Sequence, residues 1–197
     1  MTPHPDFAEL FAVLNGPESP ARVAWKGDVF RATTPRWMSR PYRLTGVGAL
    51  LSGGRWNTRQ LIPVVNFGTT AEVTFAEADS RNRRAGWTGP ILPQTRVAFH
   101  VNLHALLDLT DPAVLKTLGV KRADLLQCEW QTEQNAGREP LTQALSRAAF
   151  ETLGEGLIVP SARLINGVNL VVFPAHLHPA STLTVHAESH IPFVHGI

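Results

Sequence analysis

The chain has 197 residues, of which 44% are hydrophobic, a formal net charge of +2 and a single cysteine, Cys128. This length predicts one domain with a substantial core, and a lone cysteine excludes an intramolecular disulfide, which fits a reducing cytoplasm. The thinly spread Lys and Arg favour small anionic ligands over nucleic acid. We find neither a signal-peptide pattern nor an apolar run of about 20 residues, so we expect neither secretion nor a membrane-spanning helix.

The first quarter of the chain predicts a helix, two strands and a long loop. Apolar residues recur at helical spacing over residues 5–15, so we expect an amphipathic helix that covers the core. Strands are expected at 23–25 and 28–33, and the second carries Arg31. Residues 34–52 show no sustained period, and a loop of that length inside a domain is usually functional or mobile.

The segment Gly53-Gly54-Arg55-Trp56-Asn57 has the composition of a phosphate-binding loop. Adjacent glycines allow a tight turn and a close backbone approach to a ligand, while the arginine supplies a planar cationic fork that suits phosphate. The asparagine can hydrogen-bond locally within the turn. The alternative is an ordinary hairpin whose arginine is solvated. An apolar strand over residues 62–67 follows.

A helix after this strand is expected to direct Glu77 inward. Thr69 and Glu72 have the spacing of a capping box. Glu72 should lie on the side of the helix that faces water, and the helical period places Glu77 on the opposite side. A carboxylate directed into a core is costly unless it is paired or functional. A salt bridge to Arg31 or Arg55 is the structural alternative, and it is compatible with a catalytic role.

The second half of the chain predicts alternating strands and helices. His100 lies on an expected strand and His104 in the turn that follows it, and no third ligand is apparent, so we interpret both as structural and expect no metal site. Ser161 follows an apolar strand, where its hydroxyl can bind a ligand or cap a turn, and no Gly-x-Ser-x-Gly sequence marks it as an acyl-transfer nucleophile. Strands are expected at 94–102, 157–160, 168–173 and 182–186, and helices at 112–118, 123–130 and 140–153, which together predict an α+β domain.

Several separated motifs carry a resemblance to a known family. They are Phe30-Arg31, Gly53-Gly54-Arg55-Trp56-Asn57, Val64-Val65 before the helix with Glu77, and Val159-Pro160-Ser161-Ala162 with Asn169 and Pro174-Ala175-His176. In this order they resemble the RES-domain family, which is named for its Arg, Glu and Ser. The resemblance covers about residues 28–180 of a single domain over 1–197, with residues 1–20 as an N-terminal helical extension. It implies similarity to the ADP-ribosyltransferase fold, with two packed, mainly antiparallel sheets flanked by helices.

The resemblance also implies a function. Members are toxins of bacterial toxin-antitoxin pairs that consume NAD+ by hydrolysis, phosphorolysis or ADP-ribosyl transfer, without a metal. An Xre-like antitoxin inhibits them, so a hetero-oligomer or a homodimer is expected, with no direct contact to nucleic acid or membrane. By position, Glu77, Arg31 and Ser161 match the catalytic residues. The expected NAD+ contacts are Arg31, Arg55, Asn66, Tyr42, Trp56 and Ser161.

The residue types suit this chemistry, with one departure from the family pattern. Cleaving the bond between ribose and nicotinamide develops positive charge on the sugar, which the Glu77 carboxylate would stabilise, while two arginines hold the pyrophosphate. Nicotinamide leaves as a neutral molecule, so no general acid is needed. The family strand usually ends Val-Val-Tyr, whereas this one ends Val64-Val65-Asn66. The missing ring must come from Tyr42, Trp37 or Trp56; alternatively, the protein binds a nucleotide or its antitoxin without turnover.

Overall fold

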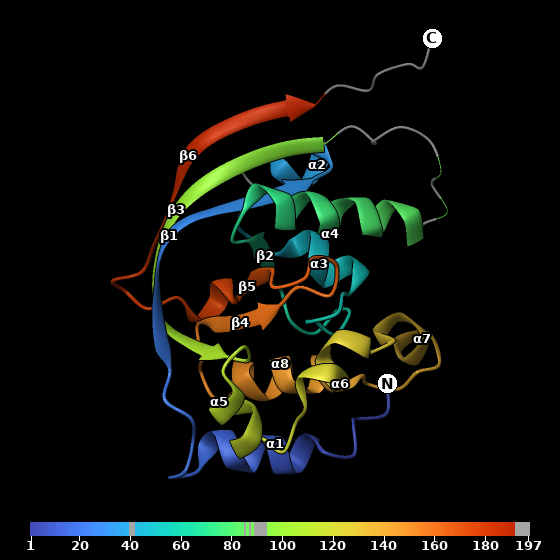
Figure 1. The fold of residues 1–197 in the computed structure, drawn as a ribbon, viewed down its shortest axis with the longest axis vertical. Coiled ribbons are helices and arrows are strands. Elements are labelled where there is room, and N and C mark those ends of the chain that lie inside the picture. Colours follow the sequence, from blue (N-terminus) through green and yellow to red (C-terminus); the bar gives the residue numbers. More distant parts are fainter. Residues whose placement is uncertain (40–41, 85, 87, 89–93, 192–197) are drawn as a thin grey trace.

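Six strands form a single sheet around which the helices are arranged (Figure 1). The structure is a computed structural model that describes residues 1–39, 42–84, 86, 88 and 94–191. The strands are β1 (Val23–Thr33), β2 (Val65–Gly68), β3 (Gln94–Asp108), β4 (Gly156–Pro160), β5 (Val168–Val172) and β6 (Thr182–Ile191). Their order in the sheet is β1-β2-β5-β4-β3-β6, and β1 also pairs with β3.

The additional pairing closes five strands into a ring. β3 pairs with β1 along its length, with β6 over its first part and with β4 at its end, and only the β3–β4 pairing is parallel. β1 reaches β2 at the far end through Phe30 and Gly68. We expected two packed sheets, and the structure instead joins all strands in one sheet. The reason is the length of β1 and β3, 11 and 15 residues, which lets different parts of each strand pair with different neighbours.

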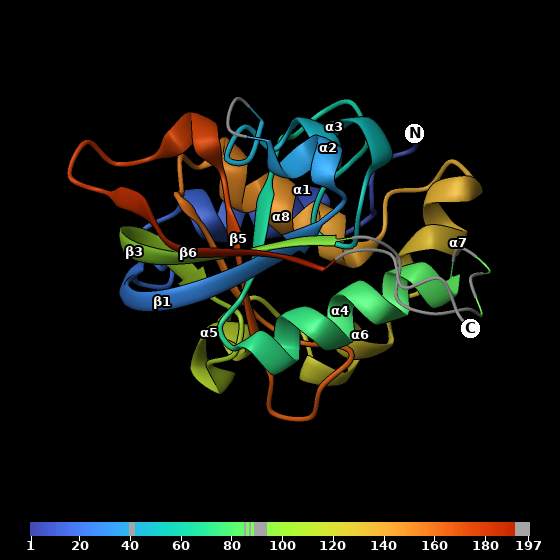
Figure 2. The same ribbon diagram turned by 90° about the horizontal axis from the view of Figure 1, so that it is seen from above.

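The helices divide into two groups around the sheet. They are α1 (Phe7–Asn15), α2 (Pro35–Met38), α3 (Val47–Ser52), α4 (Ala71–Arg84), α5 (Pro112–Thr117), α6 (Arg122–Gln127), α7 (Trp130–Asn135), α8 (Leu141–Glu151) and the 3-10 turn η1 (Pro174–His176). Helices α1, α5, α6 and α8 gather at one end below β4 and β5 (Figure 1). Figure 2 shows α2 and α3 on one side of β1 and β3, and α4 on the other. None of the helices in the described part of the chain is long and apolar enough to cross a membrane.

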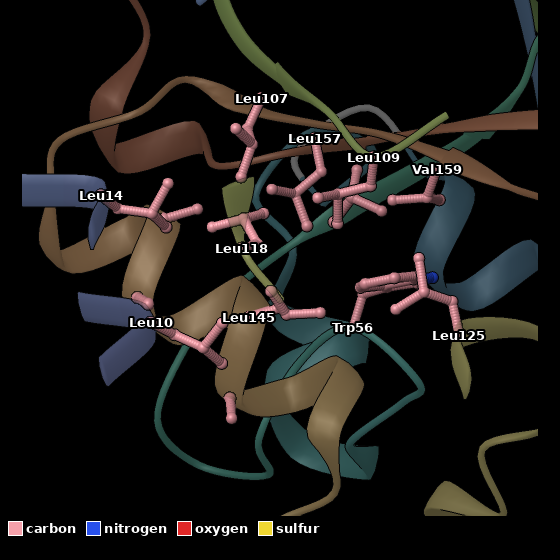
Figure 3. Close-up of a cluster of buried hydrophobic side chains, with 14 of the residues drawn as sticks. Leu10, Leu14, Trp56, Leu107, Leu109, Leu118, Leu125, Leu145, Leu157 and Val159 are labelled. Atoms are coloured by element: carbon pink, nitrogen blue, oxygen red, sulfur yellow. The ribbon is translucent and has the colours of Figure 1, made fainter. Parts of the chain in front are cut away.

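Two hydrophobic clusters cover the two faces of β4 and β5. Alternating side chains of a strand point to opposite faces, so Val159 and Val171 pack with α1 and α8, whereas Ile158 and Leu170 pack inside the ring. Figure 3 shows the first group, which we call the helical cluster. Its members include Leu10, Leu14, Trp56, Leu107, Leu109, Leu118, Leu125, Leu145, Leu157 and Val159. Both faces of the central strands are therefore buried, which gives the loops after them a rigid base.

Most expected elements are confirmed, and the differences have local causes. The two strands expected around Lys26-Gly27 are one continuous strand, β1, in which Gly27 adopts a φ of 153°. The expected loop at 34–52 contains the short helices α2 and α3, which are too brief to show a period, while residues 40–41 lie outside the described part. The cap of α4 is Thr70 instead of Thr69, because the Thr70 hydroxyl accepts the Val73 N–H at 3.2 Å.

Candidate functional site

Helix α4 is fixed against the sheet one turn before Glu77. The Thr74 hydroxyl donates to the main-chain carbonyl of Phe30 on β1 at 3.1 Å. Gly68 permits this approach, because a Cβ at that position would collide with the Thr74 side chain. Glu77 follows Thr74 by three residues, so both lie on one side of the helix. The carboxylate of Glu77 is consequently half-buried against the sheet instead of pointing into solvent.

The hairpin formed by β4 and β5 supplies two polar side chains beneath this helix. Val159 pairs with Asn169, and the Ser161 N–H donates to the Gly167 carbonyl at 2.8 Å, which extends the ladder beyond β4. Ser161 and Val159 share one face because they are two residues apart. Asn169, opposite Val159, is therefore the diagonal neighbour of Ser161 on that face.

These elements bring Glu77, Ser161 and Asn169 together in what we call the carboxylate cluster. The Ser161 hydroxyl donates to Glu77 Oε1 at 2.7 Å, and Asn169 Nδ2 donates to the same oxygen at 3.2 Å. Ser161 is buried, and its Oγ accepts the N–H groups of Arg163 and Leu164, both at 3.1 Å. The serine is thus a turn cap and a partner of the carboxylate at once. Among the described residues, both donors to Glu77 bind Oε1 and none donates to Oε2.

Arg31 is held by a main-chain group of β2. Its guanidinium is 9% exposed and donates through Nη1 to the main-chain carbonyl of Asn66 at 3.0 Å. Asn66 is exposed on β2, two residues before Gly68, and Gly68 pairs with Asn169 of the cluster. This hydrogen bond therefore fixes the guanidinium against the strand that pairs with Asn169 of the carboxylate cluster.

The glycine-arginine loop is a tight turn anchored to the helical end of the molecule. Gly54 and Asn57 exchange main-chain hydrogen bonds, and Gly53 adopts a φ of 71°, so the expected turn is confirmed. Gln143 of α8 donates to the Gly54 carbonyl at 2.8 Å. Arg55 is half-buried and donates through Nη1 to the carbonyl of Leu125 on α6 at 2.7 Å. Its guanidinium thus has a defined position on the helical side of the turn.

The aromatic residues expected at the site occupy two different environments. Trp56 is 6% exposed and packs in the helical cluster among Leu125 and Val159 (Figure 3). This burial gives the ring a packing role, whereas we expected it to contact NAD+. Tyr42 is 48% exposed and meets Trp37 edge to face at 6.2 Å. Tyr42 and Trp37 therefore remain the candidates for an aromatic platform.

Asn169 is the member of the cluster that was not expected as a site residue. Its signal in the sequence is positional, since it alternates with Val168 and Leu170 and so faces away from the interior of the ring. Recognising it requires the register of the hairpin, because only the pairing with Val159 places it beside Ser161. Periodicity alone does not supply that register.

A second inward carboxylate, Glu155, was also missed. Its side chain is 1% exposed, and its oxygens accept the N–H groups of His104, Ala105 and His178 at 2.6, 2.9 and 3.0 Å. Burial raises the pKa of this carboxyl, but the nearby Ser181 hydroxyl and the three N–H groups outweigh burial and leave the pKa below its ordinary value. Glu155 is ionised at neutral pH and joins β3 to the loop after β5.

The histidines of β3 make local contacts. His100 Nδ1 lies 2.8 Å from an Asp28 oxygen, and the rings of His104 and His178 are 5.2 Å apart. Within the described residues, no group of three or more His, Cys, Asp or Glu side chains could hold a metal ion.

Comparison with known proteins places this geometry in a family. The fold is similar to that in the crystal structure of the Mycobacterium tuberculosis MbcT-MbcA toxin-antitoxin complex, with a TM-score of 0.70 and 22% identity over 95% of this chain and 93% of the matched chain. In sequence the chain is 29% identical over 150 residues to the NAD(+) phosphorylase MbcT of Mycobacterium bovis and of M. tuberculosis, covering 71% of this chain and 74% of each relative. The RES domain model matches residues 28–195. The chain therefore belongs to the RES-domain family.

Proposed function

We propose that this chain is the toxin of a toxin-antitoxin pair and consumes NAD+ by cleaving the bond between nicotinamide and ribose. The observation that carries the proposal is the half-buried Glu77, whose Oε1 is held by Ser161 and Asn169 while no described residue donates to Oε2. As the bond breaks, the ribose carbon gains positive charge, and a fixed carboxylate stabilises that charge. The proposal is supported by the family and by the NAD(+) phosphorylase name of its relatives.

The charged and aromatic groups are the substrate contacts that we propose. Arg31 and Arg55 would hold the pyrophosphate, since a guanidinium binds phosphate oxygens through paired N–H groups. Asn66 and the exposed ring of Tyr42 would contact the nicotinamide ribose. We also propose that the domain shares the ADP-ribosyltransferase fold, in which an extended dinucleotide would lie across strands β1 and β2.

Phosphate is the acceptor that we propose first. The sequence relatives are named NAD(+) phosphorylases. In phosphorolysis a phosphate oxygen forms a bond to the ribose carbon as nicotinamide departs with the bonding electrons, which neutralise its ring. Water as acceptor would give ADP-ribose, and a protein acceptor would give an ADP-ribosylated side chain. The three products differ in mass, so the acceptor can be assigned directly.

The partner that we propose is an antitoxin protein of the Xre-like class that covers the site. Support comes from the related structure, which is a complex of MbcT with the antitoxin MbcA. A chain that drains NAD+ would harm its own cell unless something blocks access to Glu77. Arg31 and Arg55 favour an anionic segment of the partner at that position.

The test is to incubate purified protein with NAD+, with and without phosphate, and to measure nicotinamide release by chromatography and the second product by mass spectrometry. We expect release, with ADP-ribose phosphate when phosphate is present. In bacteria, expression of the chain alone should arrest growth and lower NAD+, and co-expression of the antitoxin should relieve both effects. Normal growth and NAD+ levels during verified soluble expression would contradict the toxin role.

A second candidate function is binding without turnover, either of a nucleotide or of the antitoxin alone. The observation that favours it is Asn66, which is exposed on β2 where the family tyrosine would stand. Calorimetric binding of NAD+ together with no nicotinamide release over hours would establish this alternative.

A further inference from the structure

We propose that Ser161 and Asn169 are positioning residues, which act on the reaction only through Glu77, and that Ser161 is not a nucleophile. The inference rests on the proposed function, because it concerns how the same site cleaves NAD+. It assigns to Asn169 a role that the family name, built on Arg, Glu and Ser, does not contain.

The hydroxyl of Ser161 has all of its hydrogen-bonding positions filled. A serine hydroxyl offers one donor and two acceptor positions. Its proton is donated to Glu77 at 2.7 Å, and both acceptor positions are used by the N–H groups of Arg163 and Leu164. To attack a ribose carbon, the oxygen would first have to transfer its proton to Glu77 and use the electron pair of the broken O–H bond. Protonation would remove the negative charge of Glu77 that stabilises the ribose carbon in the proposed reaction.

The two donors instead set the rotation of the Glu77 carboxylate. The last torsion of a glutamate side chain has a broad energy minimum, so an unheld carboxylate turns easily. Ser161 and Asn169 both donate to Oε1, at 2.7 and 3.2 Å. Two donors on one oxygen fix the plane of the group and leave the other oxygen, Oε2, in a constant place. A fixed charge is more effective than one that must reorient as the reaction proceeds.

The donors can hold the carboxylate because they stand on rigid elements. Asn169 lies within β5, and Ser161 is bound to Gly167 through the main chain at the end of β4. Glu77 comes from α4, which packs against β1 and β2. The hydrogen bonds therefore tie a helical carboxylate to the sheet, so that a shift of α4 relative to the hairpin would displace the charge.

The test is a double-mutant cycle on nicotinamide release by the full chain, with kcat and KM for NAD+ measured separately. Ser161→Ala and Asn169→Leu should each lower kcat by about ten-fold to a hundred-fold, while KM stays within about three-fold because substrate contacts are kept. Ser161→Thr keeps the hydroxyl and should recover most of kcat. In a Glu77→Gln background, neither substitution should lower the residual rate further.

Matched controls separate positioning from folding. Ser146 on α8 is buried, and its hydroxyl has no hydrogen-bond partner in the described part of the chain, so Ser146→Ala should leave kcat and KM unchanged. If Ser161→Ala proves unstable, Asn169→Leu and Ser161→Thr carry the same test. A KM that rises with an unchanged kcat would show that the two residues affect only substrate binding, by shaping the hairpin of β4 and β5, and would overturn the inference.

The remaining outcomes distinguish this inference from the proposed function. Additive losses in the Glu77→Gln background, or an ADP-ribosyl adduct on Ser161 in rapidly quenched reactions, would show that Ser161 acts independently and would overturn the inference alone. A wild-type protein that binds NAD+ and releases no nicotinamide would overturn both.

Discussion

Glu77 and Glu155 are two inward carboxylates that the fold holds with different kinds of donor. Glu155 is almost fully buried, and main-chain N–H groups of His104, Ala105 and His178 bind both of its oxygens. Glu77 is half-buried, and the two donors that it has among the described residues are side chains that bind a single oxygen.

The difference separates a structural carboxylate from a candidate catalytic one. Main-chain N–H groups cannot find other partners without moving the backbone, so Glu155 is needed for the conformation itself. Side-chain donors can be removed while the backbone stays in place, and an oxygen without a donor can still interact with a ligand. Burial of a carboxylate alone therefore does not identify a site; the type of donor and the remaining capacity of each oxygen do.

The largest effect is expected from Glu77→Gln. The substitution keeps the shape of the side chain and removes the charge that stabilises the transition state, so kcat should fall by about 10²- to 10³-fold, with little change in melting temperature. Nicotinamide release reports the rate. Glu72→Gln, on the exposed side of the same helix, is the control and should remain fully active. Activity near that of the wild type in a folded Glu77→Gln protein would make Glu77 a structural residue like Glu155.

Glu155→Gln should have the opposite effect, a loss of stability with little change in kcat. An amide donor would face N–H groups that need an acceptor, so we expect the free energy of unfolding to fall by about 2–4 kcal/mol, with kcat per folded molecule unchanged. Urea unfolding followed by tryptophan fluorescence measures the loss. The control is Glu151→Gln. Glu151 forms an ion pair with Arg147 at 3.4 Å, but Glu151 is exposed, so the pair should contribute less than about 1 kcal/mol. Equal losses for the two variants would refute the role given to Glu155.

The lowered pKa of Glu155 also predicts that the stability of the protein depends on pH. The pKa of Glu155 is lowered in the folded protein, so the unfolded chain takes up the proton more readily. The stabilisation from this group is complete above the unfolded value of about 4.5 and is lost as the pH falls from there through the lower folded pKa. Wild type should therefore lose more stability than Glu155→Gln between pH 6 and the acid range. Urea titrations of both proteins at several pH values test this. An identical dependence of the free energy of unfolding on pH in the two proteins would contradict it.

The smallest effect is expected from moving the helix that carries Glu77. A Cβ on Gly167 would lie 2.9 Å from Val73 Cγ2, so Gly167→Ala should push α4 away from the hairpin. We expect a loss of about 1 kcal/mol in stability and a kcat lowered by a few-fold. Adding Val73→Ala should restore part of kcat by making room, although Val73→Ala alone leaves a cavity. No coupling between the two substitutions would show that this contact does not position Glu77.

The sequence allowed several of these elements to be predicted because their signals are local. The helices over residues 5–15 and 140–153 follow from apolar periodicity, and Asp111 caps α5 as expected by accepting the Ala113 N–H at 2.8 Å. Glu77 was identified as inward by the same period, and the structure places it against Ser161. These inferences need only neighbours within a few residues.

The parts that could not be predicted depend on pairing between distant segments. Closure of the sheet through β1 and β3, the place of Asn169 beside Ser161, and the donors of Glu155 all require the register of strands far apart in the chain. Trp56 was expected at the site as a substitute for the missing family tyrosine, but the tight turn at 54–57 directs its large ring into the helical cluster. In a tight turn, adjacent side chains can point into different environments, and the composition of the segment does not reveal which side chain points where.

The separation of the cluster residues along the chain has a consequence for synthesis. Glu77 is 84 residues from Ser161 and 92 from Asn169, so the cluster forms only when a late hairpin docks beneath an early helix. Contacts between such distant segments form slowly, because a long loop must close first. On the ribosome, the arginines and the glutamate emerge well before the hairpin. A nascent chain that stops before residue 169 thus carries Glu77 without the strand that holds its carboxylate, so the carboxylate cluster cannot form until the hairpin has been made.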